Sequence, residues 1–195
     1  MDGRTSSYDG ALTYFAIVAM FTTGMRVNEL LTLRLQDVDA RTGILHVRGK
    51  GNRERRVYMA GPETLIVLRS FVARRRTLNL RSEQLLVTPR GNPVTPSLLR
   101  GRLRILARRA RIARRVTRHM LRHTAATQLM EAGVDIRFVQ RLLGQTSIAI
   151  TEIHTHVSDR TLQDVLTRAN TLRRVGQTPL VEQLEVPLAG SSIAA

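Results

Sequence analysis

The 195-residue sequence contains no cysteine. This absence excludes disulfides, cysteine nucleophiles and zinc sites with cysteine ligands, and it agrees with a reducing compartment. Long apolar runs are also missing, because the best candidate, residues 11–21, is about a dozen residues long and roughly 20 are needed to span a bilayer. The flanks of this run do not suit a signal peptide either. We therefore expect a cytoplasmic protein without a membrane partner.

Lysine is almost absent. Lys50 is the only lysine among 31 Lys and Arg residues, which outnumber 15 Asp and Glu residues and give a net charge of +16. So large an excess on a folded domain is typical of a polyanion partner, and nucleic acid is the first candidate. A ribosome-associated or membrane-surface protein can carry the same charge. However, a hydrophobic content of 43% with helical periodicity argues against a disordered basic tail.

Apolar periodicity and capping residues predict a mainly helical chain. Helices, with their caps, are expected at residues 9–21, 23–38, 62–77, 95–111, 117–133, 135–144, 147–154 and 159–168. Two β-rich runs, 44–48 and 53–59, predict a hairpin with Lys50 at its glycine-flanked tip. A strand at 84–88 would complete a small three-stranded antiparallel sheet. The expected fold class is therefore α+β, mainly α.

One domain is the default at this length, and we expect it to comprise residues 1–176. Residues 177–195 contain acidic and apolar residues but no arginine, so they are expected to form a separate tail.

Within the domain, the arginines of the helix predicted at 95–111 point in several directions. They form either a solvated face or a surface that contacts phosphates, and the overall charge favours phosphates. The candidate phosphate-binding residues are Arg100, Arg104, Arg108 and, on the next helix, Arg118.

Histidine and arginine share a face of the helix predicted at 117–133. His119 and Arg122 are three residues apart. An arginine can clamp two non-bridging phosphate oxygens while a histidine donates a hydrogen bond or moves a proton. The alternative is an ordinary surface helix. His119 and His123 also have the i, i+4 spacing of half a zinc site, but no glutamate adjoins His119 and no cysteine exists, so we disfavour metal binding.

Two basic residues are chemically unusual for their positions. Arg26 lies in the first turn of a predicted helix, where a cation opposes the helix dipole, so something other than helix stability fixes it there. Arginine cannot release a proton near neutral pH, whereas lysine can. Lys50 therefore suits a site that protonates a leaving alkoxide. The alternative for Lys50 is an ordinary exposed hairpin tip.

Taken together, these segments resemble the catalytic domain of the tyrosine recombinase, or phage integrase, family. TGMRVNELLTLRLQDVD is similar to the first arginine box, VRGKGNRERRVYM to the lysine hairpin, HMLRHTAATQLMEAG to the HxLRHTxAT box and LLGQTSIAITEIHTHV to the final box. The resemblance covers about residues 9–170, in order along the chain. It implies the integrase catalytic-domain fold, double-stranded DNA as partner, a nucleoid-associated protein, and site-specific recombination or integration without a metal or nucleotide cofactor.

The resemblance also implies roles for single residues. Arg26 and Arg122 would bind the scissile phosphate and stabilise the pentacoordinate transition state, and Glu29 would support Arg26. Lys50 would be the general acid for the 5′-oxygen leaving group. His119 would assist proton transfer and hold the phosphate. A covalent protein–DNA phosphodiester would conserve the bond energy of the cleaved strand.

Two positions depart from the family pattern. Gln145 stands where the family has its second histidine, and its amide can still donate a hydrogen bond to a phosphate oxygen. His154 stands where the family has its nucleophilic tyrosine, and the only tyrosines, Tyr8, Tyr14 and Tyr58, all precede the HxLRHT box. We therefore expect impaired strand cleavage.

The alternatives for His154 stay open. It is a remnant in a protein that binds DNA without cutting it, a substitution that traps a complex, or a nucleophile that forms a phosphoramidate. A partner protomer could also supply the nucleophile. The alternative function is a non-catalytic DNA-binding, regulatory or architectural partner of an active recombinase, and a second recombinase is a candidate partner.

The resemblance carries two expectations about the ends of the chain. Most family members have an N-terminal helical domain that closes around the duplex, and we expect this core-binding domain to be absent here. DNA affinity would then be weak and strongly salt-dependent. The tail at 177–195 offers an apolar stripe that neighbouring protomers would exchange on DNA, giving a homo-oligomer; the alternative is a flexible end. The stripe consists of Leu180, Val181, Leu184 and Val186.

Overall fold

The computed structural model describes residues 3–49, 54–113, 115–144 and 159–170. Its helices are α1 Gly3–Thr23, α2 Val27–Thr32, α3 Pro62–Thr77, α4 Pro96–Arg109, α5 Arg118–Glu131, α6 Ile136–Leu143 and α7 Asp159–Ala169, with a 3-10 turn η1 at Leu35–Asp37. Strands β1 Val38–Asp39, β2 Ile44–Arg48 and β3 Glu54–Tyr58 form one antiparallel sheet in the order β1-β2-β3. The predicted α+β class, mainly α with a small antiparallel sheet, is confirmed.

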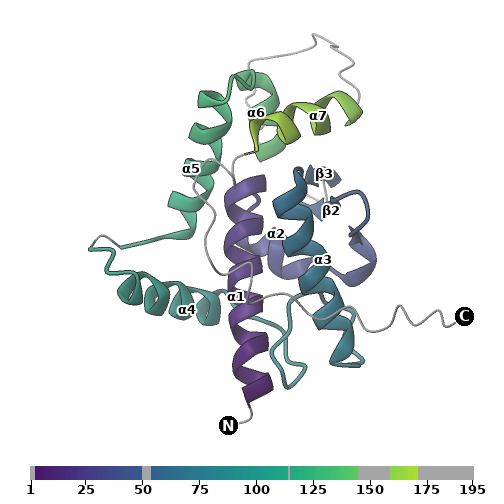
Figure 1. The fold of residues 1–195 in the computed structure, drawn as a ribbon, viewed down its shortest axis with the longest axis vertical. Coiled ribbons are helices and arrows are strands. Elements are labelled where there is room, and N and C mark those ends of the chain that lie inside the picture. Colours follow the sequence, from purple (N-terminus) through teal and green to yellow (C-terminus); the bar gives the residue numbers. More distant parts are fainter. Residues whose placement is uncertain (1–2, 50–53, 114, 145–158, 171–195) are drawn as a thin grey trace, which may run out of the picture.

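Helix α1 is the centre of the fold, and the other elements surround it (Figure 1). Leu12, Phe15 and Ala19 of α1 are fully buried. A helix that is apolar on most of its sides is stable only inside a core. Helices α3 and α5 both pack against α1, and the Phe15 and Phe71 rings stack with their centroids 4.3 Å apart. The arginine-rich helix α4 projects from the lower half of α1.

The N-terminus of α1 differs from the prediction. Asp9 was expected to cap the helix, but α1 begins at Gly3 and Asp9 lies inside it. The Asp9 carboxylate accepts a hydrogen bond from the guanidinium of Arg102 on α4 instead, at 2.5 Å. The predicted end is confirmed. Gly24, which follows the helix, has a φ of 62° and donates its N–H to the carbonyl of Met20 at 3.0 Å.

The hairpin predicted at 44–48 and 53–59 is confirmed by β2 and β3. The predicted third strand is wrong, because β1 pairs with β2 on its other side. Residues 84–88 make only isolated bridges, to Arg34 and to Pro93. These residues therefore brace the region after α2 rather than extending the sheet.

Helix α2 is shorter than predicted, because the backbone that follows it pairs with a distant segment. The carbonyl of Leu33 accepts from the N–H of Leu85, and the N–H of Leu35 donates to the carbonyl of Glu83, both at 2.8 Å. These bonds replace the i to i−4 bonds that a helix continuing to Val38 would need. The chain forms η1 instead.

The later helices start where local capping signals predict them. The hydroxyls of Thr95 and Thr117 accept hydrogen bonds from the backbone N–H groups of Leu98 and Met120, both at 3.2 Å. Each of these bonds satisfies one free donor at a helix N-terminus. Helix α4 ends slightly before its predicted limit, and the helix predicted at 147–154 lies outside the described residues.

A second group of buried apolar residues joins α5, α6 and α7, which lie at the top of Figure 1. Polar contacts fix α7 to the body. The Gln163 side chain donates to the carbonyl of Thr42 at 2.7 Å, and the Asn170 side chain donates to Glu63 at 3.0 Å. No helix in the described part of the chain is both long and apolar enough to cross a membrane.

Replacing Gly24 with alanine should destabilise the protein by about 3 kcal/mol, because a residue with a side chain is strained at positive φ and overpacks the core. A Cβ on Gly24 would overlap with Cδ2 of Leu143. Gly10 is the matched control. A Cβ there meets nothing within 4 Å, so Gly10→Ala inside α1 should stabilise by up to about 1 kcal/mol. Urea unfolding measures both changes, and equal stabilities would contradict the close packing at Gly24.

Candidate active site

A buried carboxylate at the start of α2 holds the first arginine in place. The Glu29 side chain is only 4% exposed. Its Oε2 accepts the backbone N–H of Arg26 at 2.7 Å, and its Oε1 accepts a guanidinium N–H of Arg26 at 3.1 Å. The anionic side chain also offsets the positive end of the helix dipole. Glu29 therefore explains how a cation is tolerated at this helix N-terminus.

A second arginine, Arg55 on β3, binds the same carboxylate. Its two terminal nitrogens donate to both oxygens of Glu29, at 2.6 and 2.9 Å. The paired geometry is the strong, bidentate form of this interaction. The sequence reasoning did not single out Arg55. A signal was available, because the strand alternation places Arg55 on the same face as Val57 and Met59, which are both buried.

The charge state of Glu29 follows from these contacts. Burial by itself would raise the pKa of Glu29, but the hydrogen bonds from Arg55 and from Arg26 outweigh it and lower the pKa from its ordinary value of 4.5. Glu29 is therefore ionised at neutral pH.

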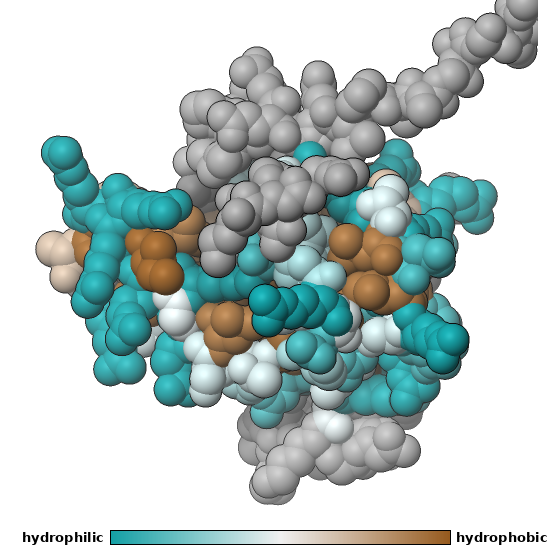
Figure 2. Space-filling model, turned by 90° about the horizontal axis from the view of Figure 1, so that it is seen from below, coloured by the Kyte–Doolittle hydropathy of each residue, from teal (hydrophilic) through white to brown (hydrophobic). Residues whose placement is uncertain are grey.

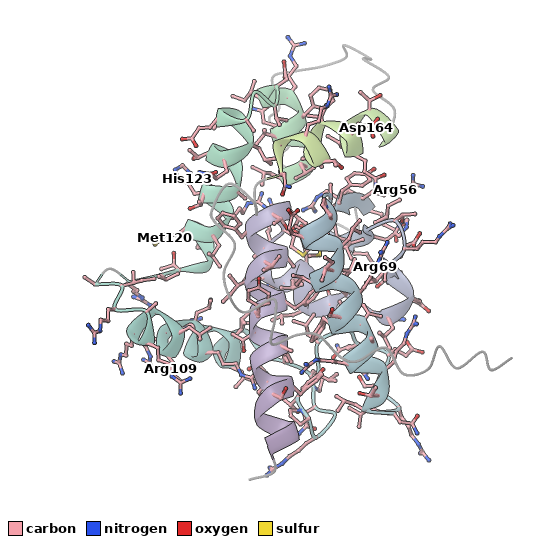
Figure 3. The ribbon with its side chains drawn as sticks, viewed as in Figure 1. Arg56, Arg69, Arg109, Met120, His123 and Asp164 are labelled. Atoms are coloured by element: carbon pink, nitrogen blue, oxygen red, sulfur yellow. The ribbon has the colours of Figure 1, made fainter. Side chains whose placement is uncertain are left out.

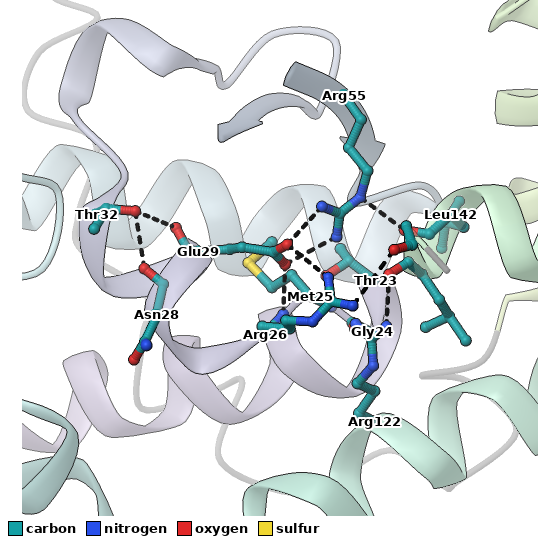
Figure 4. Close-up of polar contacts among 12 residues, drawn as sticks. Thr23, Gly24, Met25, Arg26, Asn28, Glu29, Thr32, Arg55, Arg122 and Leu142 are labelled. Carbon is teal, nitrogen blue, oxygen red and sulfur yellow. Dashed lines mark hydrogen bonds and ion pairs between the residues drawn. The ribbon is translucent and has the colours of Figure 1, made fainter. Parts of the chain in front are cut away.

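The third arginine, Arg122, projects from α5 to the junction of α1 and α6 (Figure 4). Its two terminal nitrogens donate to the carbonyls of Gly24 and Leu143. Burial, and then the positive charge of Arg26, lower the pKa of Arg122 to about 10. The Arg122 cation is thus intact at neutral pH but is destabilised by its surroundings, and a nearby anion would relieve both effects.

The C-terminal end of α6 brings the three arginines together. Arg55 Nε donates to the carbonyl of Leu142 at 3.1 Å, Arg122 donates to that of Leu143, and Arg26 reaches that of Gly144 at 3.4 Å. The last carbonyls of a helix have no partner within the helix and form the negative end of its dipole. They therefore suit guanidinium donors. Three consecutive carbonyls, those of residues 142–144, each accept a hydrogen bond from an arginine in a different part of the chain.

Arg26, Arg122 and His119 line one pocket of about 600 Å³. His119 is exposed and lies one turn before Arg122 on α5. The full lining comprises residues 25–29, Thr32, Arg48, Gly49, His119 and Arg122. A second pocket of about 500 Å³ shares Glu29, Thr32 and Arg48 with the first. The first pocket is basic, because its lining has three arginines and one carboxylate, whereas the second adds the carboxylates of Asp37 and Glu83.

Glu29, singled out from the sequence as the support of Arg26, also lines the first pocket. Lys50, Gln145 and His154 lie outside the described residues, and so does the side chain of Arg118. His123 points away from α1 on the outer side of α5 (Figure 3). In the described ranges, no group of three or more His, Asp and Glu side chains is placed to hold a metal ion.

The remaining phosphate-binding candidates are exposed on α4. They are Arg100, Arg104 and Arg108. Apolar side chains lie between them, since Ile105 is 50% exposed and Leu106 is 37% exposed. Figure 2 shows a face of the described residues that is mostly hydrophilic, with separate apolar patches between long hydrophilic side chains. The face of α4 is thus basic and mixed rather than uniformly polar.

A small α+β domain whose pocket gathers three arginines and a histidine beside a buried carboxylate is suited to binding a phosphate group. The comparisons with known proteins are more specific. The model of the phage integrase family matches residues 4–161, and the chain belongs to that family. A tyrosine recombinase of Agathobacter rectalis is 35% identical over 157 residues, which are 80% of this chain and 51% of the relative.

Solved structures agree with this assignment of the fold. The crystal structure of XerA recombinase matches with a TM-score of 0.65 and 36% identity, over 86% of this chain and 63% of that chain. The XerH site-specific recombinase bound to difH substrate, in a pre-cleavage complex, matches with a TM-score of 0.61 and 26% identity, over 83% and 50%. The predicted integrase catalytic-domain fold is confirmed. The chain spans about half the length of the Agathobacter relative.

Glu29→Gln should lower the free energy of unfolding by about 3 kcal/mol at pH 7, because it leaves the mostly buried guanidinium of Arg55 without its anion. The folded-state pKa of Glu29 is lowered, so the wild type holds this stability above pH 4.5 and loses it as the pH falls through the folded pKa. The difference between the two proteins should therefore shrink in acid. Urea unfolding between pH 7 and pH 3 measures it.

Glu83→Gln is the matched control for this measurement. Glu83 is 72% exposed and pairs with Arg34 at the surface, so its loss should cost less than about 1 kcal/mol. A stability difference between wild type and Glu29→Gln that stays constant across the pH range would contradict the assignment of the ionised, buried carboxylate.

Proposed function

We propose that this chain binds double-stranded DNA and acts in site-specific DNA recombination or integration. The observation that carries the proposal is the meeting of Arg26, Arg122 and His119 at one pocket. Two guanidiniums and an imidazole match the non-bridging oxygens of a phosphodiester. The XerH recombinase, which is bound to its difH substrate in the crystal, supports DNA as the partner.

The charge balance of the pocket also supports an anionic ligand. Three arginines, Arg26, Arg55 and Arg122, surround the single carboxylate Glu29. Burial and the neighbouring Arg26 already destabilise the Arg122 cation and lower its pKa to about 10. A phosphate placed between Arg26 and Arg122 would balance the excess positive charge. The α4 arginines 100, 104 and 108 and Arg118 would contact flanking phosphates.

The chemistry suited to this site is a phosphodiester transesterification. A nucleophile attacks the phosphorus and the bond to the 5′ oxygen breaks, while Arg26 and Arg122 stabilise the charge on the non-bridging oxygens. Lys50 would give a proton to the leaving 5′ oxygen, with help from His119. Gln145 would add a hydrogen bond to the phosphate. The covalent intermediate conserves the bond energy, so the reaction requires no metal or nucleotide.

We also propose that strand cleavage by this chain is impaired, because His154 stands where the family motif has tyrosine. Imidazole is shorter than a phenol, and its attack would form a phosphoramidate instead of a phosphotyrosine. This replacement favours a second candidate function. The chain would then be a non-catalytic DNA-binding or architectural partner of an active recombinase.

His154→Tyr should create a covalent protein–DNA adduct that the wild type forms poorly or not at all, because only the nucleophile is missing. The assay uses a nicked suicide duplex that carries the candidate recombination site, resolved on a denaturing gel. His154→Tyr combined with Arg122→Ala is the matched control, and it should lower adduct formation by at least about a hundredfold while duplex binding persists.

Other results would contradict parts of the proposal. An acid-labile wild-type adduct that His154→Ala abolishes would show histidine attack and overturn the impaired cleavage. No adduct with either protein, despite duplex binding, would favour the architectural role. A preference for structured RNA over duplex DNA in competition binding would overturn the DNA function itself.

Residues 1–176 would form the DNA-binding body, and the tail at 177–195 would join neighbouring protomers on DNA. Deleting the tail should lower the sedimentation coefficient of the protein–DNA complex, because the apolar contacts between protomers are lost. Leu180→Ser with Leu184→Ser should have the same effect. Ser191→Ala is the control and should leave the complex unchanged. Complexes of equal size with and without the tail would rule out the exchange.

A further inference from the structure

Arg55 is a nearly buried cation on the core-facing side of β3. Its register partner on β2 is Val47, which is fully buried, and its own side chain is only 16% exposed. A charge in such a position is stable only when it is paired and hydrogen-bonded. Arg55 is outside the lining of the 600 Å³ pocket, so its charge does not serve the ligand by direct contact.

The two arginines bound to Glu29 differ in the strength of their contacts. Arg55 makes the bidentate pair, at 2.6 and 2.9 Å, from a mostly buried position. Arg26 gives one guanidinium bond at 3.1 Å, and its side chain is 47% exposed. Figure 4 shows both guanidiniums converging on the carboxylate. Arg55 is thus the main charge partner of Glu29, and the guanidinium of Arg26 remains at the pocket.

We propose that Arg55 is a positioning residue of the phosphate site. By neutralising Glu29 it prevents that carboxylate from drawing the whole Arg26 guanidinium away from a bound phosphate. Its bond from Nε to the carbonyl of Leu142 also fixes β3 to the end of α6. The inference rests on the proposed function in one respect, which is that the anion held by Arg26 is a phosphate.

The role of Arg55 has a consequence that simple structural support does not. In Arg55→Gln, the unpaired Glu29 competes with phosphate for Arg26, so phosphate binding weakens. In the double variant Glu29→Gln with Arg55→Gln, the competing carboxylate is gone. Phosphate binding should then recover, although the positive charge of Arg55 is still missing.

The test titrates inorganic phosphate into the protein and follows the Nε–Hε NMR signal of Arg26, identified by its loss in Arg26→Lys. Arg55→Gln should bind phosphate about tenfold more weakly than the wild type. The double variant should return to within about threefold of Glu29→Gln alone. Arg56→Gln, on the exposed outer side of β3, is the matched control and should change the affinity less than about twofold.

The double variant and Arg55→Lys keep the test decisive when Arg55→Gln fails to fold. The double variant has no unpaired buried charge and should fold. Arg55→Lys keeps the charge but loses the bidentate geometry, and it should weaken binding about threefold. A double variant as weak as Arg55→Gln, or an affinity unchanged in both Arg55 variants, would overturn the role of Arg55 alone. An Arg26 signal that does not respond to phosphate in the wild type would overturn the phosphate site as well.

Discussion

The structure around the site depends on one buried carboxylate and the end of one helix. Glu29 accepts hydrogen bonds from Arg26 and Arg55. The carbonyls of residues 142–144 accept from these two arginines and from Arg122. The desolvation cost of a buried ion pair is offset only when its donors and acceptors are hydrogen-bonded in good geometry. This requirement fixes the start of α2, strand β3, helix α5 and the end of α6 relative to one another.

The same arrangement explains why the site suits phosphate rather than a neutral ligand. One carboxylate cannot balance three guanidiniums, and helix-end carbonyls supply only partial negative charge. Burial is the largest cause of the lowered pKa of Arg122, and the positive charge of Arg26 lowers it further. Arg26 remains half-exposed at the pocket because Arg55 makes the stronger, bidentate contact with the Glu29 carboxylate. Arg55 thus contributes by positioning Arg26, although it does not line the pocket itself.

Some of the fold could be predicted because its signals are local. Thr95 and Thr117 cap their helices through hydroxyl bonds to N–H groups three residues on, and this spacing is visible in the sequence. The end of α2 and the third strand were predicted wrongly for the opposite reason. Backbone groups of Leu33 and Leu35 bond to residues 83–85, a segment that no local pattern connects to them.

Arg55 was missed because the hairpin contains several arginines and charge alone does not tell them apart. The strand alternation places Arg55 on the same face as the buried Val57 and Met59, and this could have marked Arg55 as facing the core. A core-facing arginine requires an anion, and Glu29 is the carboxylate that meets it. The identity of that partner depends on how β3 packs against α2, which is a tertiary contact.

The sequence by itself determined the family, because the motifs around Arg26, Lys50 and Arg122 occur in order with the right residue types. The same motifs predict that His154 occupies the position of the family's nucleophilic tyrosine. Only the tertiary structure decided which arginines face the pocket and which one neutralises Glu29. The physical reason is that hydrogen-bond geometry and burial depend on the packing of elements distant in sequence, whereas motifs record only residue type and spacing.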